Sequence, residues 1–275
     1  MFYPAYHLGL AYLRTGNSDS ARIYLDLATK LSSIEPLPWG DLASISNEKG
    51  DVAKAKELYQ HALDLGIRKL EALENQVMAI ITDQQGNFRL NEMDEFQEEQ
   101  DDLKNLEDLI SNSLNYLKRK NSNEDFSKFL SGYINEYPTS IFLLLYQAES
   151  YEFSKKYDQA LDIYKKVIFI NPNTTQAHEK MAHIYEILGN YDESISSYRR
   201  LISISPENEN AYDGIIRISQ KQGKLEELCS EWKILYQANP ENKTLQQRLI
   251  EVLHKTGRME EARRIIESNN QARNP

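Results

Sequence analysis

The fold of this chain is decided by residues 157–190, which read YDQALDIYKKVIFINPNTTQAHEKMAHIYEILGN, and by the two stretches of equal length that follow them. Prolines and glycines recur 34 residues apart in this region, as Pro172, Pro206 and Pro240 and as Gly189, Gly223 and Gly257. A proline ends a helix and a glycine opens a turn. Two such series in constant phase therefore predict a stacked helix–turn–helix repeat and an all-α fold.

The same spacing extends back to the start of the chain, where Gly16 and Gly50 are also 34 residues apart and each lies between two amphipathic runs. The period therefore predicts repeat units over most of the chain. No unit encloses a core of its own, so each buries its apolar face by stacking on the next.

Small and aromatic residues recur at matching positions in these units. Small residues on the predicted first helices allow close approach to the second helices, and they are Gly9, Ala43, Ala148 and Ala182. The second helices carry alanine at Ala21, Ala55, Ala160 and Ala262, and an aromatic residue at Tyr59, Tyr164, Tyr198 and Trp232. We expect these rings to fill the space between neighbouring units.

These positions resemble the tetratricopeptide-repeat family. The residues that carry the resemblance include Trp39, Leu42 and Ala43 on one first helix, and Ala160, Tyr164 and Pro172 around a later second helix. The resemblance implies a right-handed α-α superhelix, an all-α solenoid of seven to eight helix pairs. The units that match the family cover residues 2–35, 36–69, 107–140, 141–174, 175–208, 209–242 and 243–275. Departures from the family pattern are Ser194 and Leu228 for the packing alanine, Gln147 for the leucine, and Ser33 and Ile67 for the terminal proline.

The phase of the repeat breaks once, between Ile67 and Glu107. Gly86-Asn87-Phe88 looks like the turn after a first helix, but the run from Glu92 to Asp102 holds seven acids and no base. The run is either a solvated segment inserted in a degenerate repeat or an acidic docking segment for a basic partner. The predicted division is two N-terminal repeats at 1–69, a degenerate repeat with an acidic insertion at 70–106, and five repeats at 107–275.

Composition and motifs limit the function classes. With 42 acidic and 32 basic residues the net charge is −10, which disfavours a nucleic-acid partner. The single cysteine, Cys229, supplies neither a disulfide nor a thiol pair for a metal. His178 and His183 are five residues apart, which directs them about 140° apart on a helix, so one metal ion does not take both. Phosphate-loop and nucleophile motifs are also missing, so we predict no enzyme activity, no metal and no cofactor.

The groove lined by first helices is the candidate binding site, because in the family that the sequence resembles positions 2, 5, 9 and 12 of each unit point into it. In the first unit these positions form an apolar stripe of Tyr3, Tyr6, Leu10 and Leu13. Later units supply Phe142, Leu145, Glu149 and Glu152, then Gln176, Glu179, His183 and Glu186, then Asp213, Arg217 and Gln220. The acidic part favours a partner segment with Lys or Arg. Its alternative interpretation is an ordinary solvated face.

The apolar stripe also has two interpretations, a ligand surface or the face against an upstream repeat. The leading hypothesis for function is a protein-interaction scaffold or adaptor that holds a peptide, a helix or a partner protein with basic or apolar segments in the groove. The alternatives are self-assembly into a homo-oligomer through ends without a spare capping helix, a structural subunit of a larger complex, and the repeat fragment of a longer protein. An RNA-binding helical repeat is disfavoured by the acidic groove.

The sequence predicts a soluble, cytoplasmic protein without direct membrane insertion. The N-terminus lacks the basic region and cleavage site of a secretory signal. The longest apolar run, Ile141–Tyr146, is far shorter than the about 20 residues that a membrane helix needs. The alternative is a soluble fragment of a longer or membrane-anchored protein.

Overall fold

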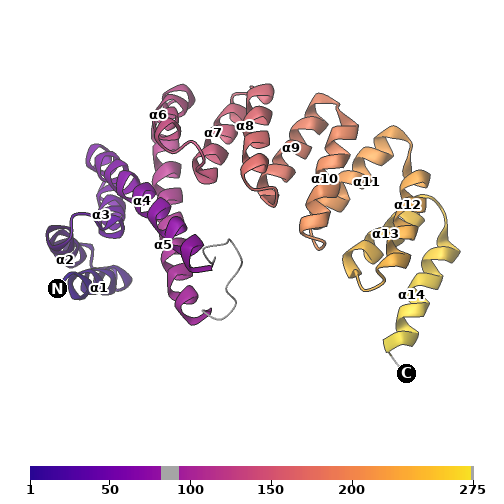
Figure 1. The fold of residues 1–275 in the computed structure, drawn as a ribbon, viewed down its shortest axis with the longest axis horizontal. Helices are drawn as coiled ribbons and strands as arrows, with labels where there is room; N and C mark the ends of the chain where they lie inside the picture. Colours follow the sequence, from indigo (N-terminus) through magenta and orange to yellow (C-terminus); the bar gives the residue numbers. More distant parts are fainter. Residues whose placement is uncertain (82–92, 274–275) are drawn as a thin grey trace. The chain divides into compact units, whose positions relative to one another are not determined.

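The computed structural model describes residues 1–81 and 93–273 of the chain, and side chains over 1–73 and 102–267. The described residues form α-helices, and within each unit most successive helices pack against one another (Figure 1). They are α1 (Phe2–Arg14), α2 (Ser18–Leu31), α3 (Pro36–Glu48), α4 (Val52–Ile81), α5 (Met93–Lys120), α6 (Asn123–Glu136), α7 (Ile141–Phe153), α8 (Tyr157–Ile170), α9 (Thr175–Leu188), α10 (Tyr191–Ile204), α11 (Glu209–Gln222), α12 (Leu225–Ala238), α13 (Lys243–Lys255) and α14 (Met259–Arg273). The chain divides into two compact units, unit 1 (Met1–Phe126) and unit 2 (Ser127–Pro275).

The predicted turn glycines adopt the left-handed backbone conformation that a tight turn between two helices requires. Their φ angles lie between 70° and 81°, and they are Gly16, Gly50, Gly189, Gly223 and Gly257. The turn between α7 and α8 has Lys155 at this point of the repeat, with a φ of 56°. A side chain in this conformation is strained. The α7–α8 turn therefore differs from the five turns above, which have glycine at the corresponding position.

Prolines and asparagines mark the connections between successive pairs. Pro206 and Pro240 each follow the last residue of a helix by two positions, as predicted from their spacing. Two residues further on, the Asn208 and Asn242 side chains accept hydrogen bonds from the backbone N–H groups of Ala211 and Leu245, at 3.0 Å and 2.8 Å. These N-caps satisfy backbone groups that the first turn of α11 and of α13 leaves unpaired.

The core of unit 2 lies between its stacked pairs. Tyr164, Tyr198 and Trp232 are buried, with at most 4% of each residue exposed, as predicted for rings that fill the space between repeats. Close approach is tightest at Gly214, where an added Cβ would lie 2.3 Å from the ring of Tyr198. The small residue on α11 therefore allows the aromatic residue of α10 to lie against the helix backbone.

Unit 1 differs from the regular repeat in its second half. We expected a helix to end near residue 69, but α4 continues through Ile67 to Ile81, and it packs along α5. Ile67 stands where the regular units have proline, so this unit lacks the proline that would end the helix there. The Gly86-Asn87-Phe88 turn lies outside the described residues.

The acidic run lies on the first turns of α5 from Met93 onward, although its side chains before Asp102 lie outside the described part. The later part of α5 carries the buried residues Leu106, Ile110 and Leu117, which pack in unit 1. Gly66 on α4 lies close to Ile110, since a Cβ there would be 3.1 Å from its side chain. The three-part division of the sequence and a docking role for the acidic run stay predictions.

Candidate functional site

The first helices of unit 2 are α7, α9, α11 and α13, and we call the surface that their polar side chains share the first-helix face. Most of the predicted groove residues of unit 2 lie on this face as partly buried or exposed side chains. The carboxylates Glu149, Glu152, Glu179 and Glu186 do not stand alone, because each is contacted by a donor on the next first helix. The predicted acidic patch is therefore a ladder of paired groups.

Glu186 on α9 forms the strongest rung. Arg217 on α11 donates from Nε and Nη2 to its two carboxylate oxygens at 2.9 Å and 2.6 Å, and Lys221 donates to Oε1 at 3.1 Å. The hydrogen bond from Arg217, supported by Lys221, lowers the pKa of Glu186 to about 2 against the effect of desolvation. Since only 10% of the Glu186 side chain is exposed, this bidentate pair joins two repeats.

Glu152 on α7 forms a rung with two partners of different kinds. Lys180 on α9 lies 3.5 Å from its carboxylate, and the hydroxyl of Tyr164 on α8 donates to the same oxygen at 3.2 Å. Burial, followed by the nearby charge of Glu152, raises the pKa of Tyr164 far above its usual value, so this tyrosine stays a donor. Glu152 on α7 therefore contacts both α8, the second helix of its own pair, and α9, the first helix of the next pair.

Arg248 on α13 forms the last of these pairings along the chain, and it was not predicted as a site residue. It lies 3.0 Å from Asp213 and 2.9 Å from Glu209 on α11, and 3.1 Å from Glu251 on its own helix. Arg248 is the sixth residue of its unit, and the family positions counted from the sequence did not include the sixth. Lys180, also the sixth residue of its unit, was missed for the same reason. A search for bases about one repeat after each groove acid would have found both.

Four predicted residues meet in a cavity of about 360 Å³ between α9, α10 and α11. They are Glu179, His183, Asp213 and Arg217, and the cavity is completed by Lys180, Tyr198 and Asn210. Phe142 and Leu145 are partly buried near the start of α7, where Phe142 contacts the ring of Tyr146 at 5.3 Å between centroids. Phe142, Leu145, Glu149, Glu152 and Glu186 do not line this cavity.

The apolar stripe of unit 1 lies on α1 as predicted from the spacing, with Tyr3 69% exposed and Tyr6, Leu10 and Leu13 partly buried. The rings of Phe2 and Tyr6 are stacked with centroids 5.9 Å apart. The role of this stripe stays a prediction.

Asp41 on α3 is a residue that the sequence reasoning missed. Desolvation raises the pKa of its carboxyl to about 6, although a hydrogen bond from the Tyr6 hydroxyl opposes the shift. Its Oδ2 atom is buried and has no hydrogen-bond partner. Burial, followed by the charge of Asp41, in turn raises the pKa of Tyr6. The apolar stripe therefore borders a carboxyl that has no basic partner among the described side chains.

The histidines and the cysteine of unit 2 occupy separate environments. His178 is buried, and its Nε2 lies 2.9 Å from the carbonyl oxygen of Pro172, whereas His183 is exposed in the cavity described above. Cys229 is buried, and desolvation raises the pKa of its thiol. Over the described residues, no three His, Cys, Asp or Glu side chains gather in a metal-binding group. In the same part of the chain, every helix is too short or too polar to span a membrane.

Antiparallel pairs that stack through buried small and aromatic residues define a helical-repeat protein. The tetratricopeptide-repeat family model matches residues 5–34, 38–65 and 175–208, and a second model of the same repeat matches residues 143–174. These four stretches of the chain therefore match the tetratricopeptide repeat. The matched units correspond to α1–α2, α3 with the first half of α4, α7–α8 and α9–α10.

Solved structures of similar length show a weak likeness. A structure of the MamA protein is 16% identical, with 81% of this chain and 94% of that chain covered and a TM-score of 0.45. PilF of Pseudomonas aeruginosa is 18% identical, with 91% and 97% covered and a TM-score of 0.43. PilW, described as a type IV pilus biogenesis factor, is 16% identical, with 90% and 98% covered and a TM-score of 0.42. A comparison with curated proteins gave no match. At these values the likeness carries no argument about partners.

Proposed function

We propose that this chain is a protein-interaction scaffold whose first-helix face in unit 2 binds a segment of a partner protein. The observation that carries the proposal is the cavity of about 360 Å³ on this face, where carboxylate, ammonium, imidazole and guanidinium groups converge. The repeat family supports it, because stacked helix pairs present an extended surface for binding. On this proposal the chain acts by binding and not by chemical catalysis.

Glu179 is the residue on which a basic partner segment is expected to dock. Its carboxylate accepts a hydrogen bond of 3.4 Å from the neutral side chain of Asn210. Glu186, by contrast, is already held by two bases, and Asp213 is paired with Arg248. A Lys or Arg side chain of the partner therefore gains a charge-assisted hydrogen bond at Glu179 at the cost of one long neutral contact. The exposed ring of His183 offers a second contact in the same cavity.

The proposal is tested by capture of partners on the intact chain and on a Glu179→Arg variant, with Glu207→Arg as the matched control. Glu207 is exposed on the turn between α10 and α11, so the control makes the same charge change away from the cavity. We expect a captured protein to be lost from Glu179→Arg and kept by Glu207→Arg.

The captured protein should also protect α9 and α11 in hydrogen-exchange mass spectrometry. Equal recovery of the same proteins by both variants, or protection confined to other helices, contradicts the proposal. Reversal of Glu186 is a poorer test, because a base at that position meets Arg217 and Lys221 and disturbs the stacking itself.

Self-assembly is a second candidate function that one observation in unit 1 favours. Ile23, Leu27 and Leu31 recur every four residues along α2 and are 66%, 43% and 44% exposed. An aliphatic stripe on a helix surface is typical of a contact with another protein. Light scattering over a concentration series tests this candidate. A mass that rises with concentration and returns to the monomer value in Leu27→Lys supports it, and a constant monomer mass contradicts it.

A further inference from the structure

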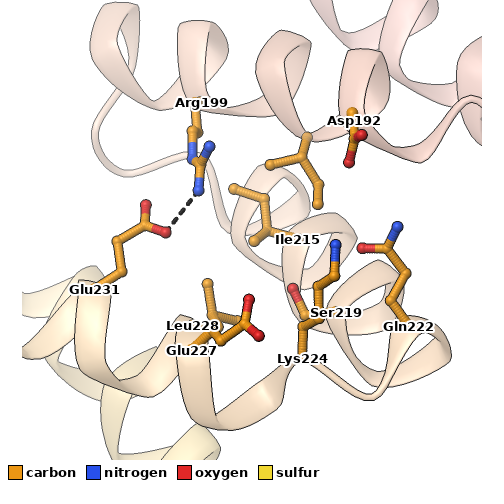
Figure 2. Close-up of a pocket in the computed structure, with 10 residues that line it drawn as sticks. Asp192, Arg199, Ile215, Ser219, Gln222, Lys224, Glu227, Leu228 and Glu231 are labelled. Carbon is orange, nitrogen blue, oxygen red and sulfur yellow. Dashed lines mark hydrogen bonds and ion pairs between the residues drawn. The ribbon is translucent and has the colours of Figure 1, made fainter.

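Unit 2 also holds two hollows that meet at one ion pair. They lie between α10 and α12, with volumes of about 300 Å³ and about 430 Å³, and both are lined by Arg199, Ile215 and Glu231. Figure 2 shows Arg199 of α10 and Glu231 of α12 pointing toward one another across the opening, with Ile215 of α11 beside them. We call this pair of hollows the second-helix site, because α10 and α12 are second helices of their pairs.

The ion pair that separates the hollows is a surface contact. Arg199 Nη2 donates to Glu231 Oε2 at 2.6 Å, and the two side chains are 53% and 38% exposed. Exposed pairs of this kind contribute little to stability, because water competes for both partners. A ligand that contacts both hollows can therefore displace this ion pair, or form hydrogen bonds with its side chains, at little cost in free energy.

The larger hollow is apolar and is built from residues that the repeat core does not fully cover. Its apolar lining comprises Ile202, Pro206, Tyr212, Trp232, Leu235 and Leu245. Trp232 is buried beneath it, with 2% exposed, while Leu235 at its edge is 47% exposed. Its volume of about 430 Å³ lies in the range of protein sites that accept a bulky apolar group. This hollow fits an aromatic or branched aliphatic side chain.

The smaller hollow is polar and has an excess of acceptors. Apart from the Arg199–Glu231 pair, its charged groups are Asp192, Glu227 and Lys224, two acids and one base. The Oε1 atom of Gln222 is buried there without a hydrogen-bond partner. In Figure 2, Gln222 and Lys224 extend toward Asp192 at the end of this hollow. An unpaired amide oxygen and a net negative charge favour a guest that brings hydrogen-bond donors and a positive charge.

We infer that the second-helix site binds a peptide segment of a partner protein in which a bulky apolar residue lies close to a lysine or arginine. The apolar residue fills the larger hollow against Trp232, and the cation enters the smaller hollow, where Gln222 Oε1 accepts a hydrogen bond and Asp192 and Glu227 balance its charge. No residue lines both this site and the cavity of the proposed function, so the two binding sites are separate.

A peptide-display selection on the full-length chain tests the inference. We expect enriched peptides that pair an aromatic or branched aliphatic residue with Lys or Arg. A synthetic copy of an enriched peptide should shift the indole resonance of Trp232 and leave that of Trp39 unchanged, since Trp39 lies in unit 1. Enrichment of acidic peptides, or no enrichment, overturns the inference.

Variants locate the binding within the two hollows. Leu235→Asp should weaken the selected peptide by about tenfold or more, because it places a charge at the apolar hollow. The matched control is Ile234→Asp, since Ile234 is 67% exposed on the same helix and does not line either hollow. Gln222→Met, which removes the unpaired acceptor at similar size, should weaken binding by about threefold. Equal affinities for the wild type and Leu235→Asp contradict the proposed position.

The Glu179→Arg variant separates this site from the proposed function. It should bind the selected peptide as the wild type does, because Glu179 lines neither hollow of the second-helix site. Loss of the peptide in Glu179→Arg places it on the first-helix face instead and overturns the second site. Failure of the Glu179 test with an intact response to Leu235→Asp leaves this inference standing.

Discussion

The first helices of the two units each carry a partly buried acid, and the pKa values of these two acids shift in opposite directions. In unit 2, Arg217 and Lys221 of the next helix hold Glu186 and keep the pKa of its carboxyl near 2. In unit 1, Asp41 contacts the hydroxyl of Tyr6, and burial raises the pKa of its carboxyl to about 6. Arg248 and Asp41 are both the sixth residue of their units, and each contacts the fifth residue of the preceding unit. At this position unit 2 has the base Arg248, which pairs with an acid, so the charged acid stabilises unit 2. Unit 1 has the acid Asp41 at the same position, and the charged form of this carboxyl lowers the stability of unit 1.

The largest expected effect is that of Asp41→Asn, which should raise the free energy of unfolding of unit 1 at pH 7 by about 1–3 kcal/mol. The folded pKa of about 6 lies above the ordinary value of 3.8, so the contribution of this carboxyl is full below about pH 4 and is lost as the pH rises through 6. The difference from the wild type should therefore vanish near pH 4.

Chemical denaturation, with hydrogen exchange read on peptides from α1 to α3, measures the effect of Asp41→Asn. The control is Glu71→Gln, because Glu71 is exposed on α4. A stability difference that is the same at pH 4 and pH 7 contradicts the prediction.

A smaller effect of opposite sign is expected for Glu186→Gln, which should lower the stability of unit 2 at pH 7 by about 1–2 kcal/mol. Because the pKa of Glu186 is depressed from 4.5 to about 2, its contribution is present above pH 4.5 and is lost as the pH falls through 2. Hydrogen exchange of α9 and α11 reports the change. Exposed Glu207→Gln is the matched control, and an equal loss in both variants would show that net charge alone is responsible.

The turns give a further contrast, within unit 2. Gly189, Gly223 and Gly257 adopt positive φ in three of its turns, whereas Lys155 adopts positive φ in the α7–α8 turn. Lys155→Gly should stabilise unit 2 by about 1 kcal/mol, because glycine adopts this conformation without steric strain. Gly189→Ala should destabilise it by a similar amount. Urea denaturation of both variants checks the pair, and a change of the same sign in both would refute the explanation.

The smallest expected effect concerns the hydroxyl of Tyr6. Tyr6→Phe should raise the pKa of Asp41 above its wild-type value of about 6, because it removes the hydrogen bond that favours the charged carboxylate. Carboxyl carbon NMR titration measures this pKa directly. Tyr3→Phe is the control, since Tyr3 is 69% exposed. A pKa of Asp41 that falls in Tyr6→Phe would show that the hydroxyl does not support the charged form.

Much of the fold could be predicted from the sequence, because helix ends depend on local residues. Proline ends a helix and glycine allows a tight turn in many folds, as Pro206 and Gly189 do here. The spacing of these residues therefore predicted the helix pairs. The continuation of α4 was missed because the resemblance placed a repeat boundary near residue 69, although Ile67 is not a residue that ends a helix.

The site was less predictable, because its contacts join residues about one repeat apart. The family positions identified Glu186 and Arg217 as groove residues, but the fact that they neutralise each other depends on the stacking of α9 on α11. The burial of Asp41 depends in the same way on the packing of its neighbours, and its residue type would ordinarily indicate an exposed side chain. The sequence therefore placed these residues on first helices but did not predict which of them pair with one another.

The ladder on the first-helix face also bears on how the protein tolerates the loss of a repeat. Each acid on an earlier helix is paired with a donor on the later one, as Glu152 is with Lys180 and Glu186 is with Arg217. Glu152 and Glu186 are both the twelfth residue of their units. Deletion of residues 175–208 would place α11 after α7 and bring Arg217 and Lys221 to Glu152. We therefore expect Glu152 to keep a basic partner after the loss of this one repeat.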